Sequence, residues 1–171
     1  DLKEGEVITV EELLYGTLLQ SGNDAATALA VCFGGNEDNF VKKMNAKARA
    51  LNCKNTNFIN PSGLFHENHY TTARDLARIA QAAMKNNTFR QIVGTKQWIS
   101  ESSGRIINNK NKTIEEYEGA TGIKIGYTKK SGRTLVASAQ REGKEFIAVV
   151  LDDPDWFQDA YSMMDYGFQR E

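Results

Sequence analysis

The sequence predicts an α+β fold in which a helical block precedes an antiparallel sheet, with a final helix against that sheet. Through about residues 9–90, apolar residues recur at helical spacing behind capping residues. From residue 94 onward the pattern changes to short extended runs joined by tight links, which is typical of antiparallel neighbours. We expect the helical part, about 9–90, and the sheet with its final helix, about 94–171, to belong to a single domain over residues 1–171.

Two capping boxes locate helix starts in the first part. Thr9 stands three residues before Glu12, and Thr72 stands three residues before Asp75. In this motif the threonine hydroxyl caps a free backbone N–H at the start of the helix, so a helix should follow each threonine. The first of these helices should end near Gln20.

A second and a third helix should follow the first. The run over about 24–33 is apolar nearly all round, which predicts burial on most sides and places Cys32 in the core. Gly34-Gly35 should end this helix, and Asn36 should cap a third one that runs to about residue 51. The stretch 52–70 is polar and rich in turn residues.

The second part of the sequence, from residue 94 onward, predicts mainly strands. Residues 94–100 favour a strand, and residues 101–121 favour a loop with a turn at Asn108-Asn109. The last extended run is apolar throughout, so it should be covered on both faces. A final helix can begin at Pro154. The three main extended segments are 123–128, 133–140 and 145–151.

Composition excludes several classes of protein. The 171 residues are 40% hydrophobic and 25% charged, with a net charge of −1, which is ordinary for a soluble globular domain. No basic cluster suggests a nucleic-acid partner, and no apolar run is long enough to span a bilayer. The chain begins in charged sequence at Asp1, without a signal-peptide pattern. The cysteines and histidines lack the spacing of metal ligands, so we expect no metal and no cofactor, while a disulfide stays open.

Two polar constellations interrupt this scaffold. Ser21-Gly22-Asn23 separates the first two helices, and Lys124-Ile125-Gly126-Tyr127-Thr128 forms the first strand of the sheet. Taken alone, the first is more often a turn with a cap, and a lysine on a strand is more often a solvated edge residue. A glycine two residues after that lysine also allows a ligand backbone to approach the strand closely.

Together the motifs resemble one family, the low-molecular-weight penicillin-binding proteins, which are serine-type D-alanyl-D-alanine carboxypeptidases. The resemblance extends over nearly the whole chain and rests on short matches in family order. They are Leu2-Lys3-Glu4-Gly5-Glu6, Leu13-Leu14-Tyr15-Gly16, Ser21-Gly22-Asn23-Asp24-Ala25-Ala26, Lys54-Asn55-Thr56-Asn57-Phe58, Asn60-Pro61-Ser62-Gly63-Leu64, His69-Tyr70-Thr71-Thr72-Ala73-Arg74-Asp75-Leu76-Ala77, Thr121-Gly122-Ile123-Lys124-Ile125-Gly126-Tyr127-Thr128, Leu135-Val136-Ala137-Ser138-Ala139 and Asp165-Tyr166-Gly167-Phe168.

The resemblance implies a β-lactamase/transpeptidase-like fold and acyl transfer on the pentapeptide of peptidoglycan, through an acyl-serine intermediate. It implies that Ser21, Asn23 and Lys124 are catalytic: Ser21 passes a proton to the leaving amine, Asn23 orients the substrate, and Lys124 attracts the terminal carboxylate. Gly126 would leave room for the substrate beside Ile125, and the N–H of Tyr127 would form half of an oxyanion hole.

This sequence departs from the family pattern at two points. The nucleophile of such enzymes lies in a Ser-x-x-Lys motif, and none occurs in residues 1–171. The expectation is therefore a partial domain, whose first strands and nucleophile helix lie upstream. The family's Lys-Thr-Gly also reads Lys124-Ile125-Gly126 here. The missing threonine hydroxyl would have donated to the substrate carboxylate.

Three hypotheses for the function stay open: a carboxypeptidase domain, an inactive homologue that binds peptidoglycan or a protein, and, last, a β-lactamase. A β-lactamase needs a deacylating glutamate, for which only Glu67 is even loosely placed. β-Lactams should bind if the nucleophile segment is present. The resemblance implies a location at the outer face of the bacterial cytoplasmic membrane. Without its upstream segment the chain should expose apolar surface at Leu29, Val31 and Val149 and self-associate.

Overall fold

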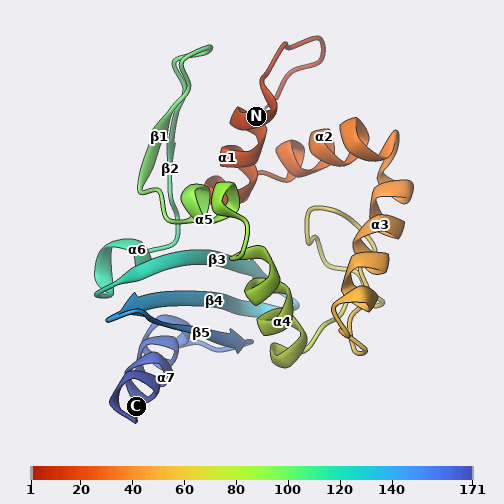
Figure 1. The fold of residues 1–171 in the computed structure, drawn as a ribbon. Helices are drawn as coiled ribbons and strands as arrows, with labels where there is room; N and C mark the ends of the chain where they lie inside the picture. The colour runs from red at the N-terminus through yellow and green to blue at the C-terminus, as the bar shows by residue number, and fades with distance from the viewer. Residues whose placement is uncertain (1, 171) are drawn as a thin grey trace.

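The first three helices follow one another along the chain: α1 (Val10–Gln20), α2 (Asn23–Gly34) and α3 (Glu37–Ala50). This computed structural model describes residues 2–170. The Thr9 hydroxyl accepts from the Glu12 N–H at 3.1 Å, as the capping box predicts. Helix α1 packs on α2, and α2 packs on α3, so the helices form a block on one side of the molecule (Figure 1).

Two further helices connect this block to the sheet. α4 (Ala73–Ala83) begins behind Thr72, whose hydroxyl accepts from the Asp75 N–H at 3.2 Å. α5 (Asn87–Val93) was not predicted as a separate helix. Its cap is Asn86, whose side chain accepts from the Phe89 N–H at 3.0 Å. α5 buries Ile92 and Val93 beside α1, and this burial stabilises so short a helix.

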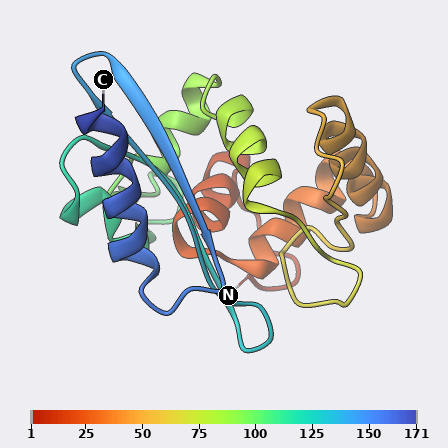
Figure 2. The same cartoon turned by 90° about the horizontal axis from the view of Figure 1, so that it is seen from below.

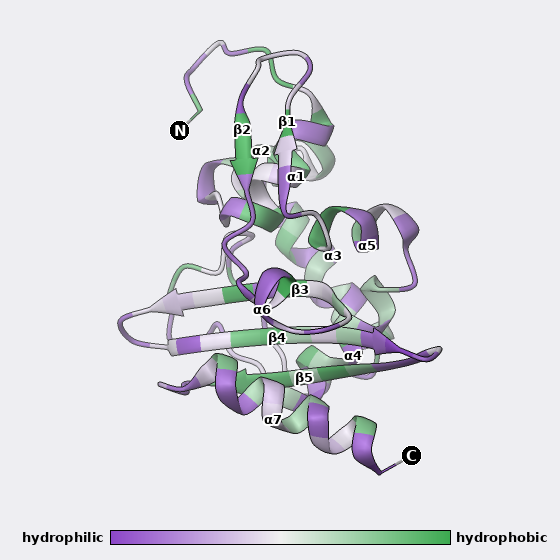
Figure 3. Ribbon diagram, turned by 90° about the vertical axis from the view of Figure 1, so that its left-hand side faces the viewer, coloured by the Kyte–Doolittle hydropathy of each residue, from purple (hydrophilic) through white to green (hydrophobic). Residues whose placement is uncertain are grey.

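Three strands form the antiparallel sheet in the order β3-β4-β5: β3 (Ala120–Thr128), β4 (Gly132–Arg141) and β5 (Lys144–Leu151). α7 (Trp156–Gln169) packs on one face of this sheet and α4 on the other (Figure 2). The predicted cover on both faces of the apolar last strand is therefore confirmed. Figure 3 shows apolar residues along β5 and alternating polar and apolar bands on α7.

The prediction of a loop over 101–121 is wrong. That region contains β2 (Ile106–Asn108), which pairs with β1 (Gln97–Ile99), and the short helix α6 (Thr113–Glu116). Asn108 lies inside β2 and is not a turn residue. The hairpin is held by contacts distant in sequence: the Trp98 ring stacks on the Tyr15 ring with centroids 4.4 Å apart.

The placement of Cys32 in the core is also wrong, because Cys32 is exposed. α2 buries Ala25, Ala26, Leu29 and Ala30. The last turn of the helix faces solvent, where Val31 is 46% exposed and Phe33 is 54% exposed. A helix composed of apolar residues all round is therefore buried along one face only. Both cysteines are free thiols, which answers the open question of a disulfide.

Candidate functional site

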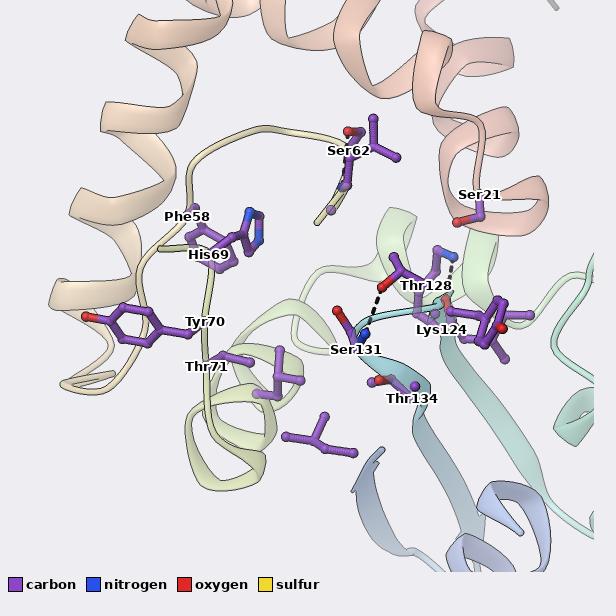
Figure 4. Close-up of a pocket in the computed structure, with 18 of the residues that line it drawn as sticks. Ser21, Phe58, Ser62, His69, Tyr70, Thr71, Lys124, Thr128, Ser131 and Thr134 are labelled. Atoms are coloured by element: carbon purple, nitrogen blue, oxygen red, sulfur yellow. Dashed lines mark hydrogen bonds between the residues drawn. The ribbon is translucent and has the colours of Figure 1, made fainter. Parts of the chain in front are cut away.

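A cavity of about 540 Å³ lies between the helical block, the connection before α4 and the edge strand β3. Ser21 reaches it from the α1–α2 junction and Lys124 from β3, while a loop carrying Ser62, His69 and Tyr70 forms the opposite side (Figure 4). All six residues singled out in the sequence line this one cavity: Ser21, Asn23, Lys124, Ile125, Gly126 and Tyr127.

Ser21 occupies a strained backbone position. Its φ of 58° and ψ of 41° are left-handed, a conformation that costs a residue with a Cβ roughly 1–2 kcal/mol. The Gly22 N–H donates to the Gly16 carbonyl at 3.0 Å and closes the end of α1. The connection after β2 fixes this end further, because the Lys110 N–H donates to the Leu19 carbonyl at 3.0 Å. The strained turn thus holds the Ser21 hydroxyl at the mouth of the cavity.

Lys124 places a positively charged ammonium group in a partly buried site. Its ammonium donates to the Ile125 carbonyl at 2.8 Å. Burial, together with the positive charge of Lys110, lowers the pKa of Lys124 from 10.5 to about 8. The side chain is therefore half-buried and still mostly charged at pH 7. Such a cation attracts a carboxylate more strongly than an exposed lysine does.

Neighbouring residues of β3 face opposite sides of the sheet. Lys124 stands opposite Val136, which belongs to the cluster beneath α4, whereas Ile125 stands opposite Leu135 and packs against the cluster beneath α7. Ile125 therefore reaches the cavity only at its rim. At Gly126 a Cβ would find its nearest neighbour 3.8 Å away, at Thr134, so the strand surface there is open to a ligand.

The outer edge of β3 offers backbone groups to the cavity. The carbonyl of Ile125 points away from β4, because it accepts from the Lys124 ammonium. In an antiparallel strand the N–H and C=O of one residue share a side, and the side alternates from residue to residue. The N–H of Tyr127 therefore also points to the cavity, although its side chain is 65% exposed.

The loop over 58–71 forms the wall that sequence reasoning missed. Phe58, Ser62, His69, Tyr70 and Thr71 line the cavity from this loop. Asn, Ser and Gly in this stretch indicate turns, but they do not indicate which way the loop will face.

Buried polar side chains hold this wall in place. Asp75, only 2% exposed, accepts from the Asn55 N–H at 2.8 Å and from the Thr56 hydroxyl at 3.0 Å. The Asn45 amide makes two hydrogen bonds to the backbone of Phe58, each of 2.8 Å. With its backbone groups satisfied in this way, the loop is ordered without regular secondary structure.

His69 presents a neutral imidazole to the cavity. Its ring lies edge-on to Phe58 with centroids 5.6 Å apart, and Nδ1 accepts from the Ile59 N–H at 3.4 Å. Burial, with the charge of His66, lowers the pKa of His69, so the ring is neutral at pH 7 and carries its proton on Nε2. No group of His, Cys, Asp and Glu side chains within residues 2–170 is arranged to hold a metal ion.

Comparison with known proteins identifies the family. The sequence profile of the D-alanyl-D-alanine carboxypeptidases of peptidase family S11 matches residues 1–155. The chain belongs to the peptidase S11 family. Among curated relatives, the D-alanyl-D-alanine carboxypeptidase DacF of Bacillus subtilis is 41% identical over 153 residues, which cover 88% of this chain and 39% of the relative. The carboxypeptidase of Streptomyces sp. K15 is 38% identical over 181 residues, which cover 96% of this chain and 62% of the relative.

Solved structures of similar proteins have the same fold. The DD-transpeptidase of Streptomyces K15 superposes with a TM-score of 0.90 at 38% identity, over 98% of this chain and 71% of that one. A D-alanyl-D-alanine carboxypeptidase of Mycobacterium tuberculosis superposes with a TM-score of 0.92 at 35% identity, over 100% of this chain and 68% of that one. The predicted penicillin-binding, transpeptidase-like fold is thereby confirmed. The chain spans 39% and 62% of the length of the two curated relatives named above.

Proposed function

We propose that the cavity binds the D-alanyl-D-alanine end of peptidoglycan stem peptides, as part of a serine-type carboxypeptidase. The observation that carries this proposal is the partly buried ammonium of Lys124 at the open edge of β3, in one cavity with Ser21. A peptide that ends in a carboxylate would place its charge at Lys124 and lie along the strand past Gly126, where no side chain obstructs it.

In the proposed reaction a serine hydroxyl attacks the carbonyl between the two D-alanines. The C–N bond breaks, an ester forms, and water later hydrolyses that ester. Ser21 passes a proton to the departing amine, and Asn23 orients the peptide. The N–H of Tyr127 donates to the oxyanion. In the family the nucleophile lies in a Ser-x-x-Lys motif, which residues 1–171 do not contain. With such a motif in place, the same site would take β-lactams.

A second candidate function is binding without catalysis, and one observation favours it. Ile125 occupies the place of the family's threonine and offers no hydroxyl to the substrate carboxylate. A protein that only recognises stem peptides would retain Lys124 and Gly126 and tolerate this change. For a β-lactamase, the third candidate, Glu67 offers little support, because it is exposed and does not line the cavity.

The proposed substrate implies a location outside the cytoplasmic membrane, at its outer face. DacF and the K15 enzyme carry the name of the same carboxypeptidase activity. Over residues 2–170, no helix has the length and apolar content to cross a bilayer.

Binding of a stem-peptide mimic tests the proposal. We expect Nα-acetyl-Nε-acetyl-Lys-D-Ala-D-Ala to shift the backbone amide signals of residues 124–128 in ¹⁵N NMR spectra, while the matched L-Ala-L-Ala peptide does not. Lys124→Gln should abolish the shifts, because it removes the charge that faces the carboxylate. Equal binding of both peptides, or unchanged binding by Lys124→Gln, would contradict the proposal.

A further inference from the structure

The outer face of α3 is strongly basic. α3 lies at the edge of the helical block, where it packs on α2 (Figure 1). Its inner face consists of Phe40, Met44 and Ala48, which are spaced four residues apart and are half-buried or buried. The opposite face is exposed to solvent. The exposed basic side chains on it are Lys42, Lys43, Lys47 and Arg49.

The helix brings these cations together in two adjacent rows. Lys42 and Arg49 lie in one row, and Lys43 and Lys47 lie in the next. At 1.5 Å per residue, the rows extend over about 10 Å along the helix axis. Ala46 lies between Lys42 and Arg49, so no large side chain separates them. In the sequence neutral residues separate most of these cations, and the helix gathers them on one surface.

No carboxylate compensates the charge of this face. Residues 39–66 contain five basic residues and no acidic one, whereas the rest of the chain contains 16 basic and 22 acidic residues. Among residues 2–170, the ion pairs of the structure involve none of the basic residues of α3. The face therefore attracts a negatively charged partner that the net negative remainder of the surface repels.

Helix dipoles explain only part of this pattern. The Lys43 ammonium donates to the Phe33 carbonyl at 2.6 Å and thereby caps the end of α2. Lys47 and Arg49 lie in the last turn of α3, where the negative end of the dipole favours cations. Neither effect accounts for Lys42, which lies near the middle of the helix. An ammonium has three donors and a guanidinium has five, so these side chains retain donors for a partner.

We propose that the outer face of α3 binds a linear polyanion, a polymer with phosphate groups in its repeats. Rows of cations along a convex helix fit a chain of charges better than a single small anion, and ammonium and guanidinium groups both donate to phosphate oxygens. A bilayer surface fits less well, because a helix that lies on a membrane directs its apolar side chains outward, whereas those of α3 lie on its inner face. This surface goes beyond the proposed function of the cavity and does not rest on it.

Fluorescence anisotropy with end-labelled long-chain polyphosphate tests the inference on the present chain. We expect binding that weakens as the salt concentration rises, because each protein cation that contacts the polymer releases counterions from it. For four such contacts to a flexible polyanion, the slope of the logarithm of the association constant against the logarithm of salt concentration should be about −3. Orthophosphate at the same total phosphate concentration should not compete.

A triple variant of α3 removes three of the four cations. Lys42→Gln with Lys47→Gln and Arg49→Gln should weaken binding about tenfold, since each exposed ion pair contributes little. The slope should fall to about −1, because one contact remains. Lys43 is retained in this variant because it caps α2.

A matched triple variant separates this face from general charge. Lys85→Gln with Lys96→Gln and Lys129→Gln removes the same charge at exposed positions outside α3, and it should leave both the affinity and the slope nearly unchanged. An equal loss in the two triple variants, competition by orthophosphate, or binding to phosphatidylglycerol vesicles without binding to polyphosphate would overturn the inference. Each of these results leaves the proposed function of the cavity untouched.

Discussion

At the scale of single residues, Lys124 combines a cost in stability with the role in binding that we propose for it. Its pKa falls from 10.5 to about 8 on burial, so at pH 7 the folded protein holds a poorly solvated ammonium. The unfolded chain binds the proton more tightly, and between these two pKa values stability rises with pH. The cost is therefore complete below pH 8 and disappears above about pH 10.5.

Lys124→Met should raise the free energy of unfolding at pH 7 by about 1–3 kcal/mol and abolish peptide binding, because the methionine side chain needs no solvation. The stability gain should shrink as the pH approaches 10.5. Urea denaturation at the two pH values measures it. A variant that is less stable than the parent at pH 7 would show that the ammonium is well solvated in the fold.

Ile125 is the second residue whose replacement is informative. Ile125→Thr should tighten binding of the D-Ala-D-Ala peptide roughly tenfold to a hundredfold, which corresponds to one hydrogen bond to a charged group. The same change should lower stability, since Ile125 packs against the cluster beneath α7. Ile125→Val removes one methylene at a cost of about 0.5–1.5 kcal/mol and adds no donor, so it should not tighten binding. If the two variants bind alike, bulk and not the missing hydroxyl limits the site.

At the scale of elements, the wall of the cavity depends on one buried carboxylate. Asp75 lies in the first turn of α4 and also accepts from Asn55 and Thr56. The capping box predicts its position in the helix. The sequence does not reveal its second set of partners, because they lie about twenty residues away along the chain. The hairpin of β1 and β2 was missed for the same reason, since Trp98 finds Tyr15 only in the folded molecule.

Asp75→Asn should loosen this wall, because one carboxylate oxygen becomes an NH₂ group. That group cannot accept a hydrogen bond, and it would face the N–H and O–H donors of the loop. We expect a loss of about 1–3 kcal/mol in stability. Backbone amides of residues 55–70 should exchange with solvent faster than those of the sheet. Hydrogen exchange followed by mass spectrometry measures this difference. Glu67→Gln on the exposed loop surface is the control and should change neither quantity.

At the scale of the whole molecule, local patterns predicted more than long-range ones. The caps at Thr9 and Thr72, and the three strands of the sheet, follow from neighbouring residues and were confirmed. The motif residues Ser21 and Lys124 were singled out far apart in sequence, and the fold brings both to one cavity. Cys32 was misplaced because composition reveals how apolar a helix is but not how many of its faces find a partner.

Exposed apolar residues at the end of α2 bear on the predicted self-association. Leu29 is 9% exposed, so it does not lie open as expected, whereas Val31 and Phe33 do. We expect the sedimentation mass of the chain to exceed its monomer mass of 19.1 kDa at high protein concentration. Val31→Thr with Phe33→Ser should restore the monomer. A parent chain that stays monomeric throughout would refute the expectation.

The last prediction concerns covalent labelling by β-lactams. Acylation needs a serine with an adjacent base, and residues 1–171 contain no Ser-x-x-Lys. The serines that line the cavity are Ser21, Ser62 and Ser131. Within the described residues, the side-chain hydrogen bonds of Ser62 go to Asn60 and its own loop, not to a lysine or histidine. The pKa of Lys124, about 8, leaves that side chain mostly protonated at pH 7, so it is a poor base for Ser21. We therefore expect intact-mass spectrometry to find no penicilloyl adduct after incubation with a fluorescent penicillin. A stoichiometric adduct on Ser21 would show that Lys124 deprotonates it, and raising the pH through 8 should then speed the labelling.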